Sequence, residues 1–303
     1  MFSVTAIGVR PEGAVDGARP DWRVLLRLLP YYAKAERLRG LLREAKVMIH
    51  NDRVELKALR RETEDQRRQI RSLEKVVTEL RRQSGAMALP PLELRTHVGR
   101  VADMANYLGQ GLDSARRVVE VFGEDPKGPV LDWGCGSGRT RLWLAEIGTW
   151  AENYRGCDVD DEAIDWLRRQ GVNNLEVCGD LPPLPYPDQS FAGLYSFSVL
   201  THIPPERHAA WYAEIHRVLK PGARAYVTVH GDDNMRSGKS FTEEERLAYA
   251  ETGASWSERD GHYKHAATVA KAFTLEALGG RFEVEAYREL GYHSMDDMIL
   301  TRI

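Results

Sequence analysis

The sequence predicts an α/β protein in which a doubly wound, mostly parallel seven-stranded sheet follows an N-terminal helical coiled coil. Two observations lead to this prediction. After residue 92, short apolar runs alternate with amphipathic stretches, which is typical of a parallel sheet covered by helices on both faces. Before residue 85, apolar residues recur at alternating spacings of four and three, which is typical of a coiled coil.

The first 32 residues predict a loose, glycine- and proline-containing lead-in and then a short helix around Leu25 and Leu28. No basic stretch precedes an apolar core there, so we expect no signal peptide. No apolar run in the sequence reaches the length of a membrane span. The three cysteines are scattered without a CxxC pair, which fits a reducing compartment, and we expect a cytoplasmic protein.

Residues 33–84 predict the coiled coil. One seam position holds Leu42, Ile49, Leu56, Thr63, Ile70 and Val77, and the other holds Leu38, Ala45, Asp52, Leu59, Gln66, Leu73 and Leu80. Leucine and β-branched residues in this arrangement favour a parallel pair, and the polar seam residues can fix its register. We therefore expect a homo-oligomer, with a dimer favoured. The alternative is a single amphipathic helix folded onto the rest of the chain.

A hinge at residues 85–91 precedes a second domain, expected over residues 92–303. Its expected helices are Leu92–Met104, Asp113–Phe122, Arg139–Ile147, Glu162–Gln170, Glu206–Leu219 and Leu275–Leu278. Its expected strands are Val130–Trp133, Tyr154–Cys157, Leu175–Cys178, Gly193–Phe197, Ala225–Val229, Phe282–Arg288 and Met298–Arg302. Residues 231–272 form a long excursion after the fifth strand, which predicts a lid or an acceptor-site insertion.

The stretch that carries the chemistry runs from Pro129 to Arg139. A short apolar strand reaches Asp132 and leads into Gly134, Gly136 and Gly138, ahead of a helix. Glycines at such a turn allow the backbone to approach a ligand closely, and the helix N-terminus offers free N–H groups. An acid two residues before the first glycine suits a ligand with an ammonium group rather than a pyrophosphate.

Two further acids follow the next two strands. Asp158 ends the second strand, where a carboxylate can hold ribose hydroxyls. Asp180 follows the third strand, where it can accept a hydrogen bond from an adenine amino group. Because parallel strands end at one edge of the sheet, the three acids are expected to converge there.

This pattern resembles the class I S-adenosylmethionine-dependent methyltransferase superfamily and, within it, the UbiE-like group. The resemblance rests on Val130–Arg139, Gly156–Asp158, Gly179–Phe191, Ser198–Ile203 and Arg217–Gly222. Residues 94–99 and 107–111 are similar to bacterial methyltransferases associated with glycan synthesis. The chain departs from the group's pattern at Ala192 and Ala223, and neither is expected to touch the cofactor. The resemblance implies a Rossmann-like methyltransferase fold.

The resemblance also implies S-adenosyl-L-methionine as the cofactor. The implied cofactor-binding residues are Asp132, Gly134, Cys135, Gly136, Gly138, Asp158, Val159, Asp180, Leu181, Ser198, Arg95 and Tyr107. Among them, Asp132 would lie near the amino group, Asp158 at the ribose, and Asp180 with Leu181 at the adenine. Ser198 would line the pocket after the fourth strand, and Arg95 with Tyr107 would close it from the N-terminal side.

The base for the acceptor is predicted among histidines that follow strands, because a sugar or alcohol hydroxyl needs one. His230, with Asp232 close behind it, follows the fifth strand and is the first candidate. His202 follows the fourth strand and is the second, with a structural role as its alternative.

The acceptor is expected to be a hydroxyl of a sugar, a glycan precursor or a related small molecule. The alternatives are O-, N- or C-methylation of a polyketide or isoprenoid natural product, and a non-catalytic coiled-coil interaction protein. Residues 196–203 contain no Asn/Asp-Pro-Pro-Tyr sequence, so a nucleic-acid acceptor is not expected. The sequence holds no metal-ligand cluster, and no metal is expected either.

Overall fold

The computed structural model describes residues 57, 89–96, 104–238, 241–258 and 265–303 of the chain. The chain divides into two compact units, Met1–Gln69 and Ile70–Ile303. In the first unit one residue is described, Lys57, which is helical and exposed. The predicted lead-in (residues 1–32), the predicted coiled coil (residues 33–84) and its dimer therefore lie outside the described residues, apart from Lys57.

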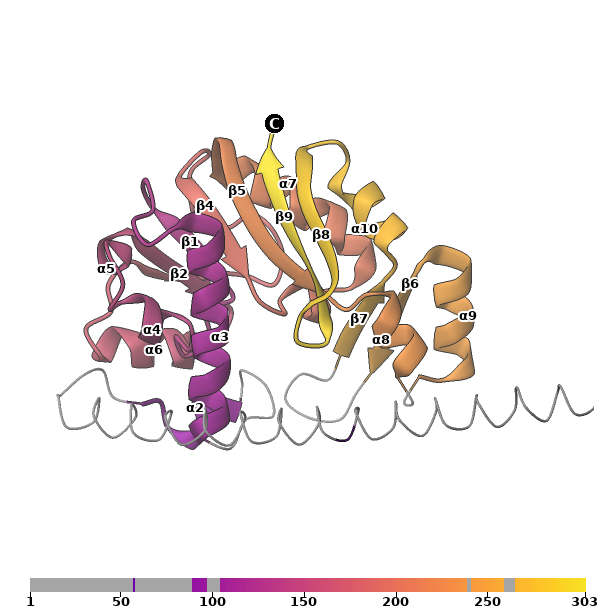
Figure 1. The fold of residues 1–303 in the computed structure, drawn as a ribbon, viewed down its shortest axis with the longest axis horizontal. Coiled ribbons are helices and arrows are strands. Elements are labelled where there is room, and N and C mark those ends of the chain that lie inside the picture. The colour runs from indigo at the N-terminus through magenta and orange to yellow at the C-terminus, as the bar shows by residue number, and fades with distance from the viewer. Residues whose placement is uncertain (1–56, 58–88, 97–103, 239–240, 259–264) are drawn as a thin grey trace, which may run out of the picture. The chain divides into compact units, whose positions relative to one another are not determined.

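A seven-stranded sheet forms the body of the second unit, in the order β3-β2-β1-β4-β5-β9-β8 (Figure 1). The strands are β1 (Val130–Trp133), β2 (Tyr154–Asp158), β3 (Leu175–Val177), β4 (Phe191–Ser196), β5 (Leu219–Val229), β8 (Phe282–Tyr292) and β9 (Met295–Arg302). The first five run parallel, and β9 is antiparallel to both β5 and β8. The predicted mostly parallel sheet is therefore confirmed.

Helices cover both faces of this sheet. They are α2 (Leu92–Thr96), α3 (Met104–Phe122), α4 (Arg141–Leu144), α5 (Trp150–Asn153), α6 (Asp161–Arg169), α7 (His208–Val218) and α10 (Lys271–Leu278), with short 3₁₀ turns η1 (Leu200–His202) and η2 (Pro205–Arg207). One apolar core joins the sheet to α7 and α10, and a second joins it to α3 and α6. Two cores on opposite faces are what a doubly wound sheet requires.

The local sequence explains why α6 begins where β2 has just ended. The Asp160 carboxylate accepts a hydrogen bond from the backbone N–H of Ala163 at 3.0 Å, which caps the helix. Acids occupy the first turn and arginines the last turn, in agreement with the helix dipole. The cap fixes the position of the preceding β2 end, which carries Asp158.

Some boundaries differ from the prediction. Helix α3 begins at Met104 rather than at Asp113, because Gly111 lies inside it as a packing residue: a Cβ there would lie 2.6 Å from the Arg139 carbonyl oxygen. The helix predicted over Arg139–Ile147 is shorter, as α4 has 4 residues. Strand β5 begins at Leu219, six residues before the predicted start at Ala225.

The predicted insertion, residues 231–272, has its own secondary structure. It contains α8 (Asp232–Ser237), α9 (Glu243–Thr252) and a separate two-stranded antiparallel sheet of β6 (Ala254–Glu258) and β7 (His265–Val269). The backbone N–H of Val269 donates to the His230 carbonyl oxygen at 2.9 Å, so β7 lies against the end of β5. Among the described residues, no helix is long and apolar enough for a membrane span.

Candidate functional site

The glycine-rich loop after β1 is held in a conformation that favours glycine. Gly134, Gly136 and Gly138 have φ angles of 80°, 49° and 76°. The backbone N–H groups of Gly134 and Cys135 both donate to the Cys157 carbonyl oxygen, at 2.8 and 3.1 Å. A Cβ on Gly134 would lie 2.1 Å from Val199 Cγ2. The loop is thus hydrogen-bonded to the end of β2 and packs closely against Val199.

Asp158 connects the end of β2 to the same loop. Its Oδ2 accepts from the Gly136 backbone N–H at 2.6 Å, and its Oδ1 accepts from the Asp160 backbone N–H at 2.9 Å. Burial raises the pKa of this carboxyl, while the two backbone hydrogen bonds lower it. The predicted ribose-binding acid therefore also sets the position of the glycine loop.

Asp132 lies beneath the loop and is 4% exposed. The Tyr154 hydroxyl donates to its Oδ2 at 3.0 Å. Burial raises the pKa of Asp132 to about 7, although the hydrogen bond from Tyr154 lowers it. A carboxylate that burial disfavours in this way would be stabilised by a cation placed beside it.

The edge formed by the ends of β2 and β3 exposes two large apolar side chains. Val159 is 58% exposed and Leu181 is 50% exposed, and Asp180 beside Leu181 is exposed as well. Exposed apolar side chains at the ligand-binding edge of an α/β sheet are suited to cover a flat ring.

The N-terminal side of the loop is contacted by α2 and α3. The buried Tyr107 hydroxyl lies 3.2 Å from the Ser137 carbonyl oxygen and 3.0 Å from Ser137 Oγ, and burial raises its pKa to about 12. Ser137 Oγ in turn donates to the Leu94 carbonyl oxygen at 3.4 Å, next to the partly buried Arg95. Arg95 and Tyr107 are thus placed beside the glycine loop.

The end of β4 carries a strained residue. Ser198 has a φ of 62°, which is unusual for a residue other than glycine. Its backbone N–H donates to Thr228 Oγ1 at 2.7 Å, and its hydroxyl lies 2.8 Å from Thr201 Oγ1. Strained backbone of this kind clusters at ligand sites.

His202 is held by the insertion. Its Nδ1 lies 3.1 Å from the His265 carbonyl oxygen of β7. Because a carbonyl only accepts, Nδ1 carries the proton and Nε2 holds the lone pair when the ring is neutral. Burial lowers the pKa of His202 from its ordinary value, which keeps the ring neutral near pH 7. The Trp256 ring stacks on the His265 imidazole at 5.1 Å and so supports this contact.

His230 and Asp232 differ in their surroundings. His230 directly follows β5 at the same edge of the sheet. Asp232 accepts from the Tyr249 hydroxyl at 2.6 Å and from the Lys271 backbone N–H at 3.5 Å, so its carboxylate joins α8 to α9 and to the start of α10. This arrangement favours a structural role for Asp232. Within the described ranges, no three His, Cys, Asp or Glu residues form a group that could hold a metal ion.

Comparison with known protein families identifies the part of the chain that contains the glycine loop. Residues 131–227, from β1 to β5, match the family model described as a methyltransferase domain. The chain contains a class I S-adenosylmethionine-dependent methyltransferase domain. S-adenosylmethionine is the cofactor of this superfamily, and the loop, Asp132 and Asp158 all lie within the matched residues.

Named relatives of this methyltransferase domain methylate different atoms. The chain is 32% identical over 111 residues to 24-methylenesterol C-methyltransferase 2 of Arabidopsis thaliana, a match that covers 35% of this chain and 30% of that protein. It is 33% identical over 112 residues to malonyl-[acyl-carrier protein] O-methyltransferase of Herminiimonas arsenicoxydans, a match that covers 36% of this chain and 40% of that protein. The match thus spans a third or so of the length of these relatives.

Solved structures of similar fold include a methyltransferase from Methanosarcina mazei. That structure is 24% identical in sequence and has a TM-score of 0.49, with coverage of 62% of this chain and 97% of that chain.

The methyltransferase domain gathers most of the predicted site residues at one sheet edge. Asp132 lies in β1 and Asp158 is the last residue of β2, while the glycine loop, Asp180 and Ser198 follow β1, β3 and β4. Three contacting residues were not predicted: Ser137, Thr228 and His265. Ser137 stands inside the loop motif and could have been found there. The other two act through long-range contacts that leave no local pattern in the sequence.

Proposed function

We propose that this domain transfers a methyl group from S-adenosylmethionine to a hydroxyl of a small-molecule acceptor, with a sugar or glycan precursor as the favoured class. The observation that carries the proposal is the convergence of the glycine loop, Asp158 and a neutral His202 at the carboxyl edge of one sheet. The acceptor oxygen attacks the sulfonium methyl, the carbon–sulfur bond breaks, and S-adenosylhomocysteine leaves. The hydroxyl proton passes to a base.

Each part of the cofactor has a candidate partner. The loop backbone and Asp132 would receive the methionine part, whose ammonium group stabilises the buried carboxylate. Asp158 would hold the ribose hydroxyls, and Val159 with Leu181 would cover the adenine. Closure by Tyr107 and Arg95 would exclude water from the reacting atoms.

His202 is favoured over His230 as the base. Its Nδ1 proton is committed to the His265 carbonyl, so Nε2 is the atom that can take a proton. Its lowered pKa keeps it ready to do so at neutral pH. Asp232, predicted beside His230, accepts a hydrogen bond from the Tyr249 hydroxyl of the insertion.

A second candidate is C-methylation of an isoprenoid. It is favoured by the aromatic cluster at the same edge, where the rings of Phe197 and Tyr292 lie 4.7 Å apart, because such a surface suits an apolar acceptor. The relative from Arabidopsis thaliana is named as a sterol C-methyltransferase.

Transfer of a labelled methyl group tests both candidates. Purified protein is incubated with methyl-tritiated S-adenosylmethionine and either nucleotide sugars or prenyl alcohols and sterols. With a hydroxyl acceptor, His202→Asn is expected to lower kcat by about 10²-fold or more, since the base is lost. With saturating S-adenosylmethionine, the wild-type rate should fall in acid as His202 is protonated, and at a lower pH than an ordinary imidazole would give, because burial lowers the pKa of His202.

A matched control is His216→Asn. His216 also contacts a backbone carbonyl, that of Ile303, but on α7 at the other end of the sheet. It should leave kcat unchanged. An unchanged kcat in His202→Asn would remove the base assignment, and labelling of carbon acceptors alone would replace the hydroxyl proposal with the second candidate.

Cofactor affinity is expected to depend on pH through Asp132. Below its pKa of about 7 the carboxyl is neutral, whereas the ammonium group of the ligand favours the charged form. Binding should therefore release a proton, and affinity for S-adenosylhomocysteine should fall about tenfold from pH 8 to pH 6. Calorimetry at these pH values checks this. Asp132→Asn, which cannot ionise, should bind more weakly and lose the pH dependence. If the affinity of Asp132→Asn changed with pH as much as that of wild type, Asp132 would not be the group that causes the pH dependence.

A further inference from the structure

The turn between β8 and β9 stands at the ligand-binding edge of the sheet. Strand β9 is antiparallel to β5, and Asp296 near its start pairs with Val229 at the end of β5. The residues of the turn, from Tyr292 to Met295, therefore lie next to the carboxyl end of β5, at the lower end of the β8–β9 hairpin in Figure 1. None of them was predicted as a site residue.

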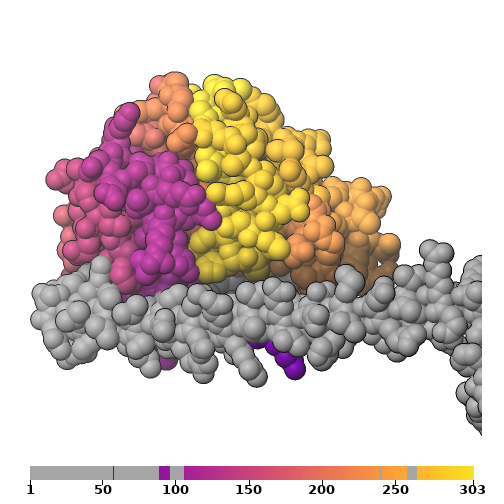
Figure 2. All heavy atoms as spheres, viewed as in Figure 1, coloured from indigo at the N-terminus to yellow at the C-terminus, as the bar shows by residue number. Residues whose placement is uncertain are grey.

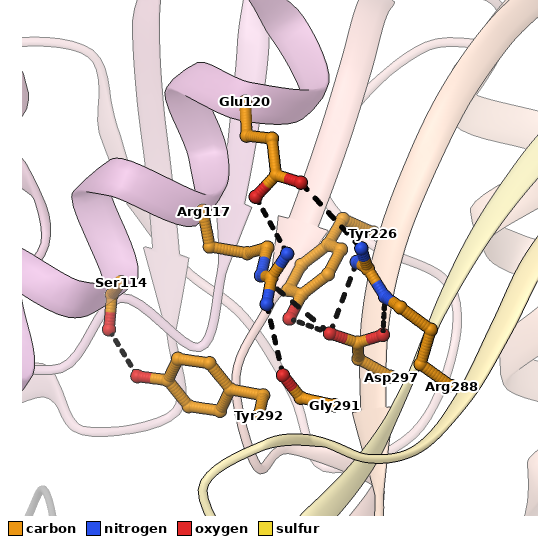
Figure 3. Close-up of polar contacts among 8 residues, drawn as sticks. All are labelled: Ser114, Arg117, Glu120, Tyr226, Arg288, Gly291, Tyr292 and Asp297. Atoms are coloured by element: carbon orange, nitrogen blue, oxygen red, sulfur yellow. Dashed lines mark hydrogen bonds and ion pairs between the residues drawn. The ribbon is translucent and has the colours of Figure 1, made fainter.

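A buried ion network holds this hairpin to α3 (Figure 3). Asp297 is 0% exposed and accepts from Arg288 Nε at 2.6 Å and from the Tyr226 hydroxyl at 2.9 Å. Arg117 of α3 lies 3.7 Å from the same carboxylate and donates to the Gly291 carbonyl oxygen at 3.0 Å. Figure 2 shows the surfaces of α3 and of the hairpin in contact along this face.

Further bonds fix the residues next to the turn. The hydroxyls of Ser114 on α3 and Tyr292 lie 2.6 Å apart, across 178 residues of sequence. The Asp296 carboxylate, on the other face of the hairpin, accepts from the Leu290 backbone N–H at 3.0 Å. The turn is thus held from both sides.

The hairpin is also strained. The pairing of β8 with β9 shifts register between Arg288 and Tyr292, which marks a bulge. Leu290, inside this bulge, has a φ of 51°, a conformation that costs about 1 kcal/mol or more for such a residue. His293 and Ser294 form a two-residue turn between the paired Tyr292 and Met295, and the φ of 53° at His293 is the positive φ that such a turn requires. Bulges of this kind re-aim side chains beside active sites.

The turn presents one exposed imidazole. His293 is exposed, and its ring packs edge-on against Tyr292 at 4.4 Å. Tyr292 packs in turn on Phe197, which follows β4 and precedes Ser198. A continuous series of rings therefore leads from the end of β4 to the tip of the hairpin.

We propose that His293 is a specificity-determining residue of the acceptor site, presented there by the bulge and by the Arg117–Asp297–Arg288 network. The inference rests on the proposed methyl transfer. The buried Tyr292 and the partly buried Phe197 support the exposed His293 from behind, and its imidazole can pack on a ring-shaped acceptor and supply a hydrogen bond to a polar group on it.

Two ligands that differ at the sulfur test this. One is S-adenosylhomocysteine, and the other is the sulfonium analogue that carries a benzyl group in place of the transferable methyl, so that the benzyl group enters the acceptor site. His293→Trp should weaken binding of the benzyl analogue about tenfold or more by narrowing the site, and His293→Ala should strengthen it. Both variants should bind S-adenosylhomocysteine within about twofold of wild type.

Gln189→Trp is the matched control. Gln189 is also exposed and also has a positive φ, 56°, but it precedes β4 at the opposite edge of the sheet. The Gln189→Trp variant should bind both the benzyl analogue and S-adenosylhomocysteine with the affinity of wild type. Equal affinity for the benzyl analogue in wild type and both His293 variants would overturn the inference while the cofactor site stands. Failure of wild type to bind S-adenosylhomocysteine would overturn the proposed function, and this inference with it.

Discussion

Asp297→Asn is expected to lower the free energy of unfolding by about 3 kcal/mol, the largest effect we expect from a single substitution in this domain. The carboxylate is fully buried and lies within reach of two guanidinium groups and one phenol. Without its charge, Arg288 and Arg117 remain partly buried with reduced compensation. Urea unfolding followed by circular dichroism measures the change.

Glu120→Gln is the control for this prediction. Glu120 belongs to the same network, with its Oε2 2.6 Å from Arg117, but its side chain is 59% exposed. Solvent screens that pair, so the cost should stay below about 1 kcal/mol. Comparable losses in the two variants would show that burial of Asp297 is not what gives the network its importance.

Gly134→Ala is expected to have the second largest effect, on both stability and cofactor binding. A Cβ there would meet Val199 Cγ2 at 2.1 Å, and a residue with a side chain is strained at a φ of 80°. Val199 or the loop must move, at a cost of about 2 kcal/mol. Since the loop is the proposed cradle of the cofactor, affinity for S-adenosylhomocysteine should fall about 100-fold, as calorimetry would measure.

Gly123→Ala separates the effect of backbone strain from the effect of the contact with Val199. Gly123 follows α3 with nearly the same φ, 81°, but a Cβ there meets no atom within 4 Å. This variant should lose about 1 kcal/mol from backbone strain and retain normal affinity. If Gly134→Ala bound S-adenosylhomocysteine as tightly as Gly123→Ala, the loop would not be the cradle.

The sheet could be predicted because its information is local. Each central strand is a short apolar run, and each acid of the proposed cofactor site lies at or near the end of its strand, as Asp158 is the last residue of β2. The small sheet of the insertion could not be predicted, since β6 reads Ala-Ser-Trp-Ser-Glu and lacks the β-branched residues of a typical strand. Its pairing with β7 and the contact of β7 with the end of β5 stabilise it instead.

The acceptor side of the site depends on contacts that the sequence does not reveal. The tautomer of His202 is set by a carbonyl 63 residues away, and Tyr292 is held by Ser114 across 178 residues. Asp232 lies near the end of a strand, as Asp158 does, yet its carboxylate accepts a hydrogen bond from Tyr249. A position after a strand brings a residue to the right edge, but tertiary contacts decide whether it faces the ligand or the scaffold.

Calorimetric titration of the purified protein with S-adenosylhomocysteine and, separately, with NAD tests the central claim most directly. Both ligands carry adenosine, and they differ in that one presents an ammonium group where the other presents a pyrophosphate. The site described here, with buried Asp132 next to the glycine loop, predicts micromolar binding of S-adenosylhomocysteine and none of NAD. Binding of NAD in preference, or binding of neither ligand by folded protein, would contradict it.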